Sequence, residues 1–327
     1  MRVGTNPQKI LNEKNLLKKH RIIIVFYNPV SNDKFFNQLD NVLDKCLDSV
    51  IKTVNFDLTQ LTVINNNSSE SANAVINKYR DYIDKYVIYN ENKGKVYAVL
   101  NEVRSVYEEF VTIADSDILF FDGWEEAVFN VFKNHPRAGT VSPYPSPYTT
   151  FYVNKSTFGL NAFKRNIKYG KFVADKDIEF YLKGTDLPNL VDRKFFSSWK
   201  EKQYISKADV CAVIGAYHVV ATYRSLQFKN IDTYPELKFV NSYEEKFIDC
   251  LADNCGMMRL STIKTYIYHI GNKMDDIANT HVNTGKDKLN STVFDEILPW
   301  VKENKIKIFL YRTVGKLMIE MKWNRTS

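Results

Sequence analysis

The chain has 327 residues, with 44% hydrophobic and 25% charged side chains and a formal net charge of +7. These values are ordinary for a soluble globular protein with a sizeable core, and the positive charge favours anionic partners such as phosphates, nucleotides or acidic lipid surfaces. The four cysteines form no Cys-x-x-Cys pair, which excludes the common zinc-site spacing and favours free thiols in a reducing compartment.

The first twenty residues carry five lysines and arginines against one acid, Glu13. We interpret residues 1–20 as a basic surface arm. Because this start is basic and polar and lacks an apolar stretch, we expect no signal peptide and a cytoplasmic location. The apolar run that follows, at residues 22–27, is far too short to span a membrane.

Strand-like and helix-like segments alternate from residue 22 to residue 114. Short apolar and β-branched runs predict strands at residues 22–27, 61–64, 86–89 and 110–114. Apolar residues at helical spacing predict helices at residues 34–53, 70–82 and 94–103. This alternation favours a parallel sheet with both faces covered, and right-handed crossovers then place the carboxyl ends of its strands on one rim.

Asp115 and Asp117 follow the last of these runs, with Ser116 between them. In open α/β sheets, ligands bind at the carboxyl ends of the strands. Carboxylate oxygens suit a hard cation such as Mg²⁺ or Mn²⁺, which commonly bridges a carboxylate to substrate phosphates. We therefore interpret this pair as a metal and phosphate site, although an isolated Asp-x-Asp is more often a solvated turn.

The alternation breaks at residues 143–209, a stretch rich in proline and aromatic residues. Its aromatic side chains either form a lid over a substrate or pack a small subdomain: Tyr144, Tyr148, Phe151, Tyr152, Phe195, Phe196 and Trp199. Strand character resumes at residues 210–222, and a helix at residues 243–254 is expected to end at Gly256. Further short strands are expected at residues 257–260 and 265–269.

An ordered set of motifs runs through these segments. Their order is the opening strand at 22–28, the strand and loop at 63–68, Asn92-Lys93-Gly94 with Ala98 and Asn101, Ala114-Asp115-Ser116-Asp117, Gly123-Trp124, Glu244-Glu245 with Gly256, and Tyr268-His269-Ile270-Gly271-Asn272. No single motif is specific, but the ordered set resembles the family 2 glycosyltransferases, which transfer a sugar from a nucleotide-sugar. The likeness covers roughly residues 22–272, most of the chain.

The resemblance implies the GT-A fold, an α/β architecture with a mostly parallel central sheet and helices on both faces. It implies a metal-dependent, inverting enzyme in which Asp117, Asp115 and His269 hold Mn²⁺ or Mg²⁺. The alternative for His269 is an ordinary histidine at the end of a strand, and His281, in a polar loop, is a rival ligand. The donor-binding residues that it implies are Tyr27, Asn65, Asn92, Gly94, Lys95, Asp115 and Ser116.

The same resemblance implies that the acceptor hydroxyl loses its proton to Glu245, with Glu244 as the other member of the acidic pair. The alternative is that both acids only stabilise a helix N-terminus through the macrodipole. Lys93 and Lys95 either contact phosphate or are solvated lysines at a helix start. At Asn65 the chain departs from the family, which usually has an acid there, although an amide can still hydrogen-bond to uracil.

The expected domains are the basic arm at 1–20, a GT-A catalytic domain at 21–294 and a basic amphipathic segment at 295–327. The catalytic domain divides into a donor-binding half at 21–142, the aromatic-rich insertion at 143–209 and an acceptor-side half at 210–294. The C-terminal segment, with seven Lys or Arg and two Glu between residues 299 and 327, either touches an anionic membrane or packs on the domain as a helix.

The expected partners are a nucleotide-sugar donor, UDP-linked, and a saccharide or lipid-linked saccharide acceptor of bacterial surface polysaccharide synthesis, with no nucleic acid. One rival is a sugar-nucleotidyltransferase, which needs a Gly-rich, Arg-containing loop after the first strand. Residues 28–32 have neither Gly nor Arg. The other rival is a non-catalytic sugar-nucleotide-binding scaffold, in which the acids are dispensable.

Overall fold

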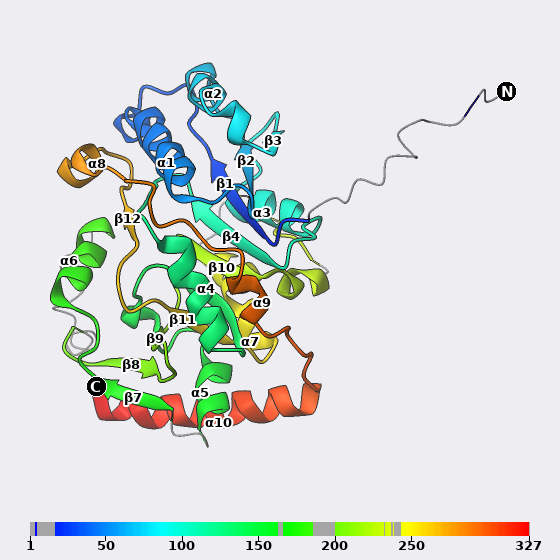
Figure 1. The fold of residues 1–327 in the computed structure, drawn as a ribbon, viewed down its shortest axis with the longest axis vertical. Helices are drawn as coiled ribbons and strands as arrows, with labels where there is room; N and C mark the ends of the chain where they lie inside the picture. Colours follow the sequence, from blue (N-terminus) through cyan, green and yellow to red (C-terminus); the bar gives the residue numbers. More distant parts are fainter. Residues whose placement is uncertain are drawn as a thin grey trace.

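The computed structural model describes residues 4, 17–162, 166–185, 200–231, 233–236, 238 and 243–326. Most of the predicted basic arm lies outside these residues, as do Phe195, Phe196 and Trp199 of the aromatic stretch. Figure 1 shows α1 and α2 at one end of the molecule and α10 along the opposite end.

Within the described residues, ten strands form one sheet in the order β3-β2-β1-β4-β10-β6-β11-β9-β8-β7. Their bounds are β1 His20–Phe26, β2 Thr59–Asn65, β3 Lys85–Ile88, β4 Phe110–Asp115, β6 Ala138–Ser142, β7 Ile167–Gly170, β8 Gln203–Ser206, β9 Ala212–Ile214, β10 Val220–Arg224 and β11 Met258–Ser261. β1 pairs in parallel with β2 and β4, and β2 pairs in parallel with β3. The carboxyl ends of these four strands therefore meet at one rim, as predicted.

The other half of the sheet is mixed. β10 lies antiparallel between β4 and β6, while β6 and β11 pair in parallel. β9, β8 and β7, at one side of the sheet, are antiparallel to their neighbours, and β8 and β7 come from the aromatic stretch. A separate antiparallel pair, β5 (Ile118–Phe120) with β12 (Ile267–His269), sets His269 opposite Ile118, two residues after Ser116.

Helices cover both faces of the sheet. Their bounds are α1 Leu39–Thr53, α2 Glu70–Asn77, α3 Lys95–Val103, α4 Trp124–Asn134, α5 Lys155–Asn161, α6 Asp175–Gly184, α7 Cys250–Asn254, α8 Asp276–Thr280, α9 Val293–Glu296 and α10 Lys305–Thr326. In β1, Ile22 and Ile24 belong to the hydrophobic cluster that includes α1 and α4, whereas Ile23 and Val25 belong to the cluster that includes α3. Since successive strand residues face opposite sides, a strand covered on both faces is apolar throughout.

Several predicted elements are shorter than expected. The helix predicted at 34–53 begins with the 3₁₀ turn Lys34–Phe36 before α1, and that at 70–82 ends in the 3₁₀ turn Arg80–Tyr82 after α2. The strand character at 210–222 belongs to β9 and β10, separated by a loop in which Gly215 has φ of +131°. The helix expected at 243–254 opens with the π-helical turn η7 (Glu245–Asp249), continues as α7, and ends before Gly256, whose φ is +70°.

Candidate active site

A cavity of about 660 Å³ opens at the rim where β1 ends, and it is the candidate active site. Its walls come from both halves of the chain: Val25, Phe26, Tyr27, Asn66, Asn92, Lys95, Val96, Tyr152, His218, Lys238, Tyr243, Glu244 and Glu245. Asp115, at the end of β4, pairs with the cavity-lining Lys95. The strand-end position predicted for the acidic pair is therefore close to a cavity large enough for a nucleotide-sugar.

Lys95 is the cation that links the two sides of this cavity. Its ammonium group pairs with the Asp115 carboxylate and lies 4.0 Å from the Glu244 carboxylate. Burial alone lowers the pKa of Lys95, but the charge and hydrogen bond of Asp115, together with the charges of Glu244 and Asp117, outweigh burial and raise that pKa above its usual value. Lys95 thus stays charged, and it can neutralise either the acids or an incoming phosphate.

Asp117 faces His269 instead of Lys95. The Oδ2 atom of Asp117 lies 3.1 Å from Nε2 of His269, while Nδ1 of His269 lies 2.7 Å from the Gly184 carbonyl oxygen. The other carboxylate oxygen of Asp117, Oδ1, is buried and has no hydrogen-bond partner. Burial alone lowers the pKa of His269, but the hydrogen bond and charge of Asp117 outweigh burial and raise it.

The donor set around Asp117 fits a divalent cation. An orphaned buried carboxylate oxygen is costly without a partner, and a bound cation supplies one. An imidazole whose other nitrogen donates to a backbone carbonyl is oriented as metal-binding histidines usually are. Within the described part of the chain, no three His, Cys, Asp or Glu side chains converge as a ready-made metal cage. Two protein ligands leave positions for water and phosphate oxygens, which is usual for Mg²⁺.

On the side of the cavity predicted to bind the donor, the amide that lines the cavity is Asn66 and not the predicted Asn65. Asn65 is 1% exposed, and its amide bonds to Asn73, Tyr86 and the Ser68 backbone. It is the last residue of β2, so its side chain points into the packing under the loop. The Asn66 amide bonds to Asn92 at 2.9 Å and accepts from the Lys93 backbone at 2.8 Å.

Gly94 and Asn92 shape the turn that opens α3. Gly94 has φ of +79°, and an added Cβ would overlap the carbonyl oxygen of Lys238. The Asn92 side chain accepts a hydrogen bond of 2.9 Å from the Gly94 backbone. The turn therefore needs glycine for two reasons, its backbone conformation and the close approach of another segment.

The remaining predicted residues have different surroundings. Tyr27 lines the cavity and is 37% exposed, and Ser116 lies half-buried in the turn between β4 and β5. Lys93 pairs with the exposed Glu91, which makes it a surface lysine. The rival ligand His281 packs its ring 4.3 Å from that of Phe121 and bonds to Asn283, so the structure does not bring it to Asp117.

The two acidic residues predicted to include the catalytic base lie on the opposite wall of the cavity. Glu244 is half-buried beside Lys95, whereas Glu245 is exposed at the start of η7 and lines the cavity. The Glu245 carboxylate makes no hydrogen bond to the described residues. Because Glu245 faces the cavity and Glu244 is held beside Lys95, Glu245 is the better placed of the two to reach a substrate hydroxyl there.

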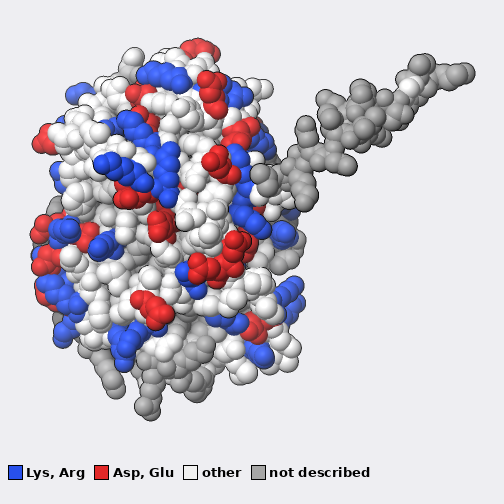
Figure 2. Space-filling model, viewed as in Figure 1, with Lys and Arg blue, Asp and Glu red and all other residues white. Residues whose placement is uncertain are grey.

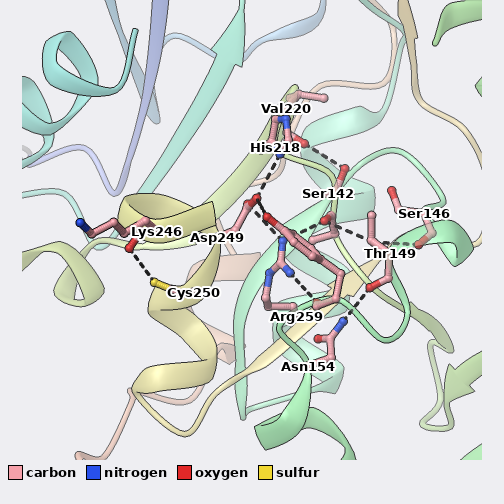
Figure 3. A network of polar contacts seen from close by, with 12 residues as sticks. Ser142, Ser146, Thr149, Asn154, His218, Val220, Lys246, Asp249, Cys250 and Arg259 are labelled. Atoms are coloured by element: carbon pink, nitrogen blue, oxygen red, sulfur yellow. Dashed lines mark hydrogen bonds and ion pairs between the residues drawn. The ribbon is translucent and has the colours of Figure 1, made fainter. Parts of the chain in front are cut away.

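Figure 3 shows a polar network behind this wall that the sequence analysis missed. Asp249 is buried at the end of η7, and its carboxylate bonds to His218 at 3.0 Å, Tyr152 at 3.1 Å and Arg259 at 3.1 Å. Arg259 also donates to the backbone carbonyls of Tyr152 and Ala216, which fixes the loop that carries His218.

Asp249 stays ionised in this network. Burial alone raises its pKa, but the charge of Arg259 and the hydrogen bond from His218 outweigh burial and lower it. Nδ1 of His218 therefore donates to a carboxylate, and Nε2 is left for the cavity that this ring lines. Only a Gly-x-x-His motif before a strand marks this residue in the sequence, which is too weak a signal to identify it.

Comparison with known proteins assigns the family. The sequence model described as "Glycosyl transferase family 2" matches residues 22–184, about half of the chain. The chain belongs to glycosyl transferase family 2. The predicted family of glycosyltransferases and the α/β fold class, with a large central sheet and helices, are therefore confirmed. No curated protein sequence matches the chain significantly.

Several solved structures are similar to this family member. They include the mannosyltransferase PcManGT from Pyrobaculum calidifontis in complex with GDP-Man and Mn²⁺, at 13% identity and TM-score 0.45 over 76% of this chain and 56% of that chain. They also include S. aureus TarS 1–349, at 14% identity and TM-score 0.47 over 95% of this chain and 74% of that chain. A complex of TarS 1–349 with UDP-GlcNAc has 14% identity and TM-score 0.45 over 81% of this chain and 61% of that chain.

Proposed function

We propose that this protein is a metal-dependent, inverting glycosyltransferase that moves a sugar from a nucleotide-diphospho-sugar, a UDP-sugar by expectation, to a saccharide acceptor. The observation that carries the proposal is that the two acids, Asp115 and Asp117, have different partners. Asp115 is paired with Lys95, and Asp117, with a buried unpartnered oxygen, is paired with His269. A cation and a buried carboxylate oxygen without a hydrogen-bond partner, both at one rim, suit a diphosphate with its metal ion better than any uncharged ligand.

On the donor side, we assign Asp117 and His269 as ligands of Mn²⁺ or Mg²⁺, with Asp115 as a further oxygen donor. Such an ion, when bound, offsets the charge that develops on the nucleoside diphosphate as it leaves. Lys95 contributes a second positive charge that can offset the negative charge of the diphosphate oxygens. Asn66, Asn92 and Tyr27 line the part of the cavity that the nucleoside fills in this proposal.

On the acceptor side, Glu245 takes the proton from the acceptor hydroxyl while that oxygen attacks the anomeric carbon. The new glycosidic bond forms as the bond from the anomeric carbon to the diphosphate oxygen breaks, and the nucleoside diphosphate leaves with the electron pair. Attack from the face opposite the leaving group inverts the configuration. A base in position contributes about 10²–10⁴ to the rate.

His218 is a positioning residue in this proposal. Its ring lines the cavity, and the buried Asp249 fixes the orientation of that ring. In the neutral imidazole, Nε2 can then accept one hydrogen bond from a substrate hydroxyl next to the one that Glu245 deprotonates. The acceptor is a glycan or lipid-linked saccharide of surface polysaccharide synthesis, in keeping with the resemblance from which this proposal starts.

A screen of nucleotide-sugars for slow donor hydrolysis, with and without Mn²⁺, tests the proposal without knowledge of the acceptor. We expect one donor to be hydrolysed to sugar and nucleoside diphosphate only when the metal is present. Release of pyrophosphate from a sugar phosphate and a nucleoside triphosphate would instead indicate a nucleotidyltransferase. Tight donor binding without any turnover, even with candidate acceptors, would indicate a binding scaffold.

A further inference from the structure

The C-terminal helix α10 has two apolar faces, of which the domain covers one. The covered face meets α5, where an added Cβ at Gly315 would overlap the Lys155 carbonyl and one at Gly159 would overlap the Tyr311 carbonyl. Met318 and Ile319 pack beside this crossing against the main core. The helix is thus seated on the domain, in agreement with the packed alternative considered for the tail.

The opposite face of α10 carries large apolar side chains that the described residues leave uncovered. Phe309 is 68% exposed and Leu310 is 54% exposed, and the same stripe holds Ile306, Leu317 and Met321. These positions recur three, four or seven residues apart, which places them on one side of the helix, away from Gly315. Scattered exposed apolar residues are normal, but a continuous stripe along one helix indicates an interaction surface.

Basic side chains border this stripe. A groove of about 500 Å³ between α5 and α10 is lined by Lys155, Lys305, Ile308, Phe309, Arg312, Thr313 and Lys316. Lys307 adds another cation on the helix, whereas Glu320 is the one acid between residues 305 and 321. On the face of the molecule drawn in Figure 2, in contrast, basic and acidic side chains are interspersed.

We propose that this surface, namely the stripe together with the groove, docks the protein on an anionic lipid membrane. Apolar side chains at the acyl boundary with lysines at the phosphate level are what an interfacial helix requires. None of the described helices combines the length and apolar character that crossing a bilayer requires. Charge complementarity selects anionic lipid over a second copy of this chain, because two such surfaces would bring their lysines together.

The surface is structurally connected to the acceptor side of the cavity. Arg312 of α10 pairs with Asp253 of α7 at 3.2 Å, and α7 continues η7, which carries Glu245. Membrane contact at α10 would therefore hold the acceptor wall close to the lipid surface. This consequence, unlike the docking itself, rests on the proposed transfer to a lipid-linked saccharide.

Co-sedimentation with vesicles tests the docking on the full chain. We expect binding to vesicles of equal parts phosphatidylglycerol and phosphatidylcholine, and much weaker binding to phosphatidylcholine alone. The double variant Phe309→Asn, Leu310→Asn should lower the affinity about 100-fold, because two apolar anchors are lost. Lys305→Gln with Lys316→Gln should lower it roughly 25-fold, about 5-fold for each charge removed, and should flatten its salt dependence.

Matched controls come from elsewhere on the surface. Val282 is 75% exposed, and Lys286 and Lys288 are exposed near it. Val282→Asn and Lys286→Gln with Lys288→Gln should leave vesicle binding within 2-fold of the unaltered chain. Circular dichroism and the melting temperature verify that each variant is folded.

Three results would overturn the docking proposal. One is a failure of the unaltered chain to bind the anionic vesicles, and another is equal binding by the Phe309 and Leu310 double variant. The third is that the unaltered chain sediments as a dimer and binds no vesicles, while the double variant sediments as a monomer. That result would assign the stripe to contact with a second copy of the chain. Donor hydrolysis, measured without vesicles on the same samples, reports separately on the proposed enzyme activity.

Discussion

The two walls of the cavity are built in different ways. The wall to which we assign the donor, called the donor wall, consists of side chains at or just after the ends of parallel strands, such as Asn66 after β2 and Asp115 at the end of β4. The wall to which we assign the acceptor, called the acceptor wall, brings together Tyr152, His218 and Asp249 from three separate segments, and the buried Arg259 connects them. One wall follows from the topology of the sheet, and the other depends on a buried polar network.

This difference has consequences for how each wall tolerates change. On the donor wall, Lys95 lines the cavity, and Asp115 and Asp117 pair with Lys95 and His269, so substitutions there should alter ligand binding more than stability. On the acceptor wall, removal of one partner leaves another polar group buried and unsatisfied, which costs stability as well. The variants below are chosen to break or sharpen this contrast, and they run from the largest expected effect to the smallest.

The largest effect is expected from removal of the metal or of its first ligand. EDTA should abolish transfer, and Mn²⁺ or Mg²⁺ should restore it. Asp117→Asn should lower the metal-dependent affinity for the nucleotide-sugar by at least about 100-fold, because a carboxylate ligand becomes a neutral amide. Calorimetric titration of the donor with Mn²⁺ measures this, with the exposed Asp57→Asn as the matched control. Full transfer by chelated enzyme contradicts the metal assignment.

Glu245→Gln should have the next largest effect, and it should separate chemistry from binding. The amide keeps the size of the side chain but cannot accept the acceptor proton, so the transfer rate should fall by about 10²–10⁴. The dissociation constant of donor plus Mn²⁺ should change little. Glu244→Gln is the control, with a milder effect because Glu244 lies beside Lys95. A loss of donor affinity in Glu245→Gln as large as that in Asp117→Asn would exclude Glu245 as the base.

Much of the donor wall could be predicted from the sequence. The runs at 22–27 and 110–114 are apolar on both faces, which predicts central strands, and the position after such a strand predicts that Asp115 and Asp117 lie at the rim. The choice between Asn65 and Asn66 could not be made, because it depends on where β2 ends. One residue of difference there reverses which side chain faces the cavity.

The acceptor wall could be predicted only in part. Helical spacing indicated the helix that carries Glu244 and Glu245, but not the π-helical turn that exposes Glu245 and buries Asp249. The pairing of Asp249 with Arg259 and His218 results from the packing of β11 and the loop before β10 against that turn. Such contacts between separate segments leave no periodic pattern in a single sequence.

Asp249→Asn should reveal the structural cost of the acceptor wall. The change leaves the buried Arg259 without its charge partner, so the free energy of unfolding should fall by about 3–5 kcal/mol. Because the folded-state pKa of Asp249 lies below the usual 3.8, its contribution is fully present above that value. The stability difference from the unaltered chain should therefore vanish as the pH falls through the lowered pKa.

Denaturant unfolding of both chains at pH 7 and at stepwise lower pH measures this difference. Asp57→Asn is again the control, and it should change the free energy of unfolding by less than about 0.5 kcal/mol. Equal stability of Asp249→Asn and the unaltered chain at pH 7 would mean that the network does not hold the acceptor wall together.

The smallest effect is expected from His218→Asn, and it distinguishes positioning from structure. The asparagine amide can keep a hydrogen bond to Asp249 but has no group at the place of Nε2. Loss of one hydrogen bond to substrate should lower kcat/KM for the acceptor about 10-fold, with donor binding unchanged. Tyr152→Phe removes another hydrogen bond to Asp249 yet keeps the imidazole, so it measures how much of the loss comes from a loosened network.

If Tyr152→Phe lowers acceptor kcat/KM as much as His218→Asn does, His218 has no role of its own toward the substrate. If His218→Asn instead lowers the rate as much as Glu245→Gln, the imidazole held by Asp249 is the base, and the assignment of Glu245 must be given up.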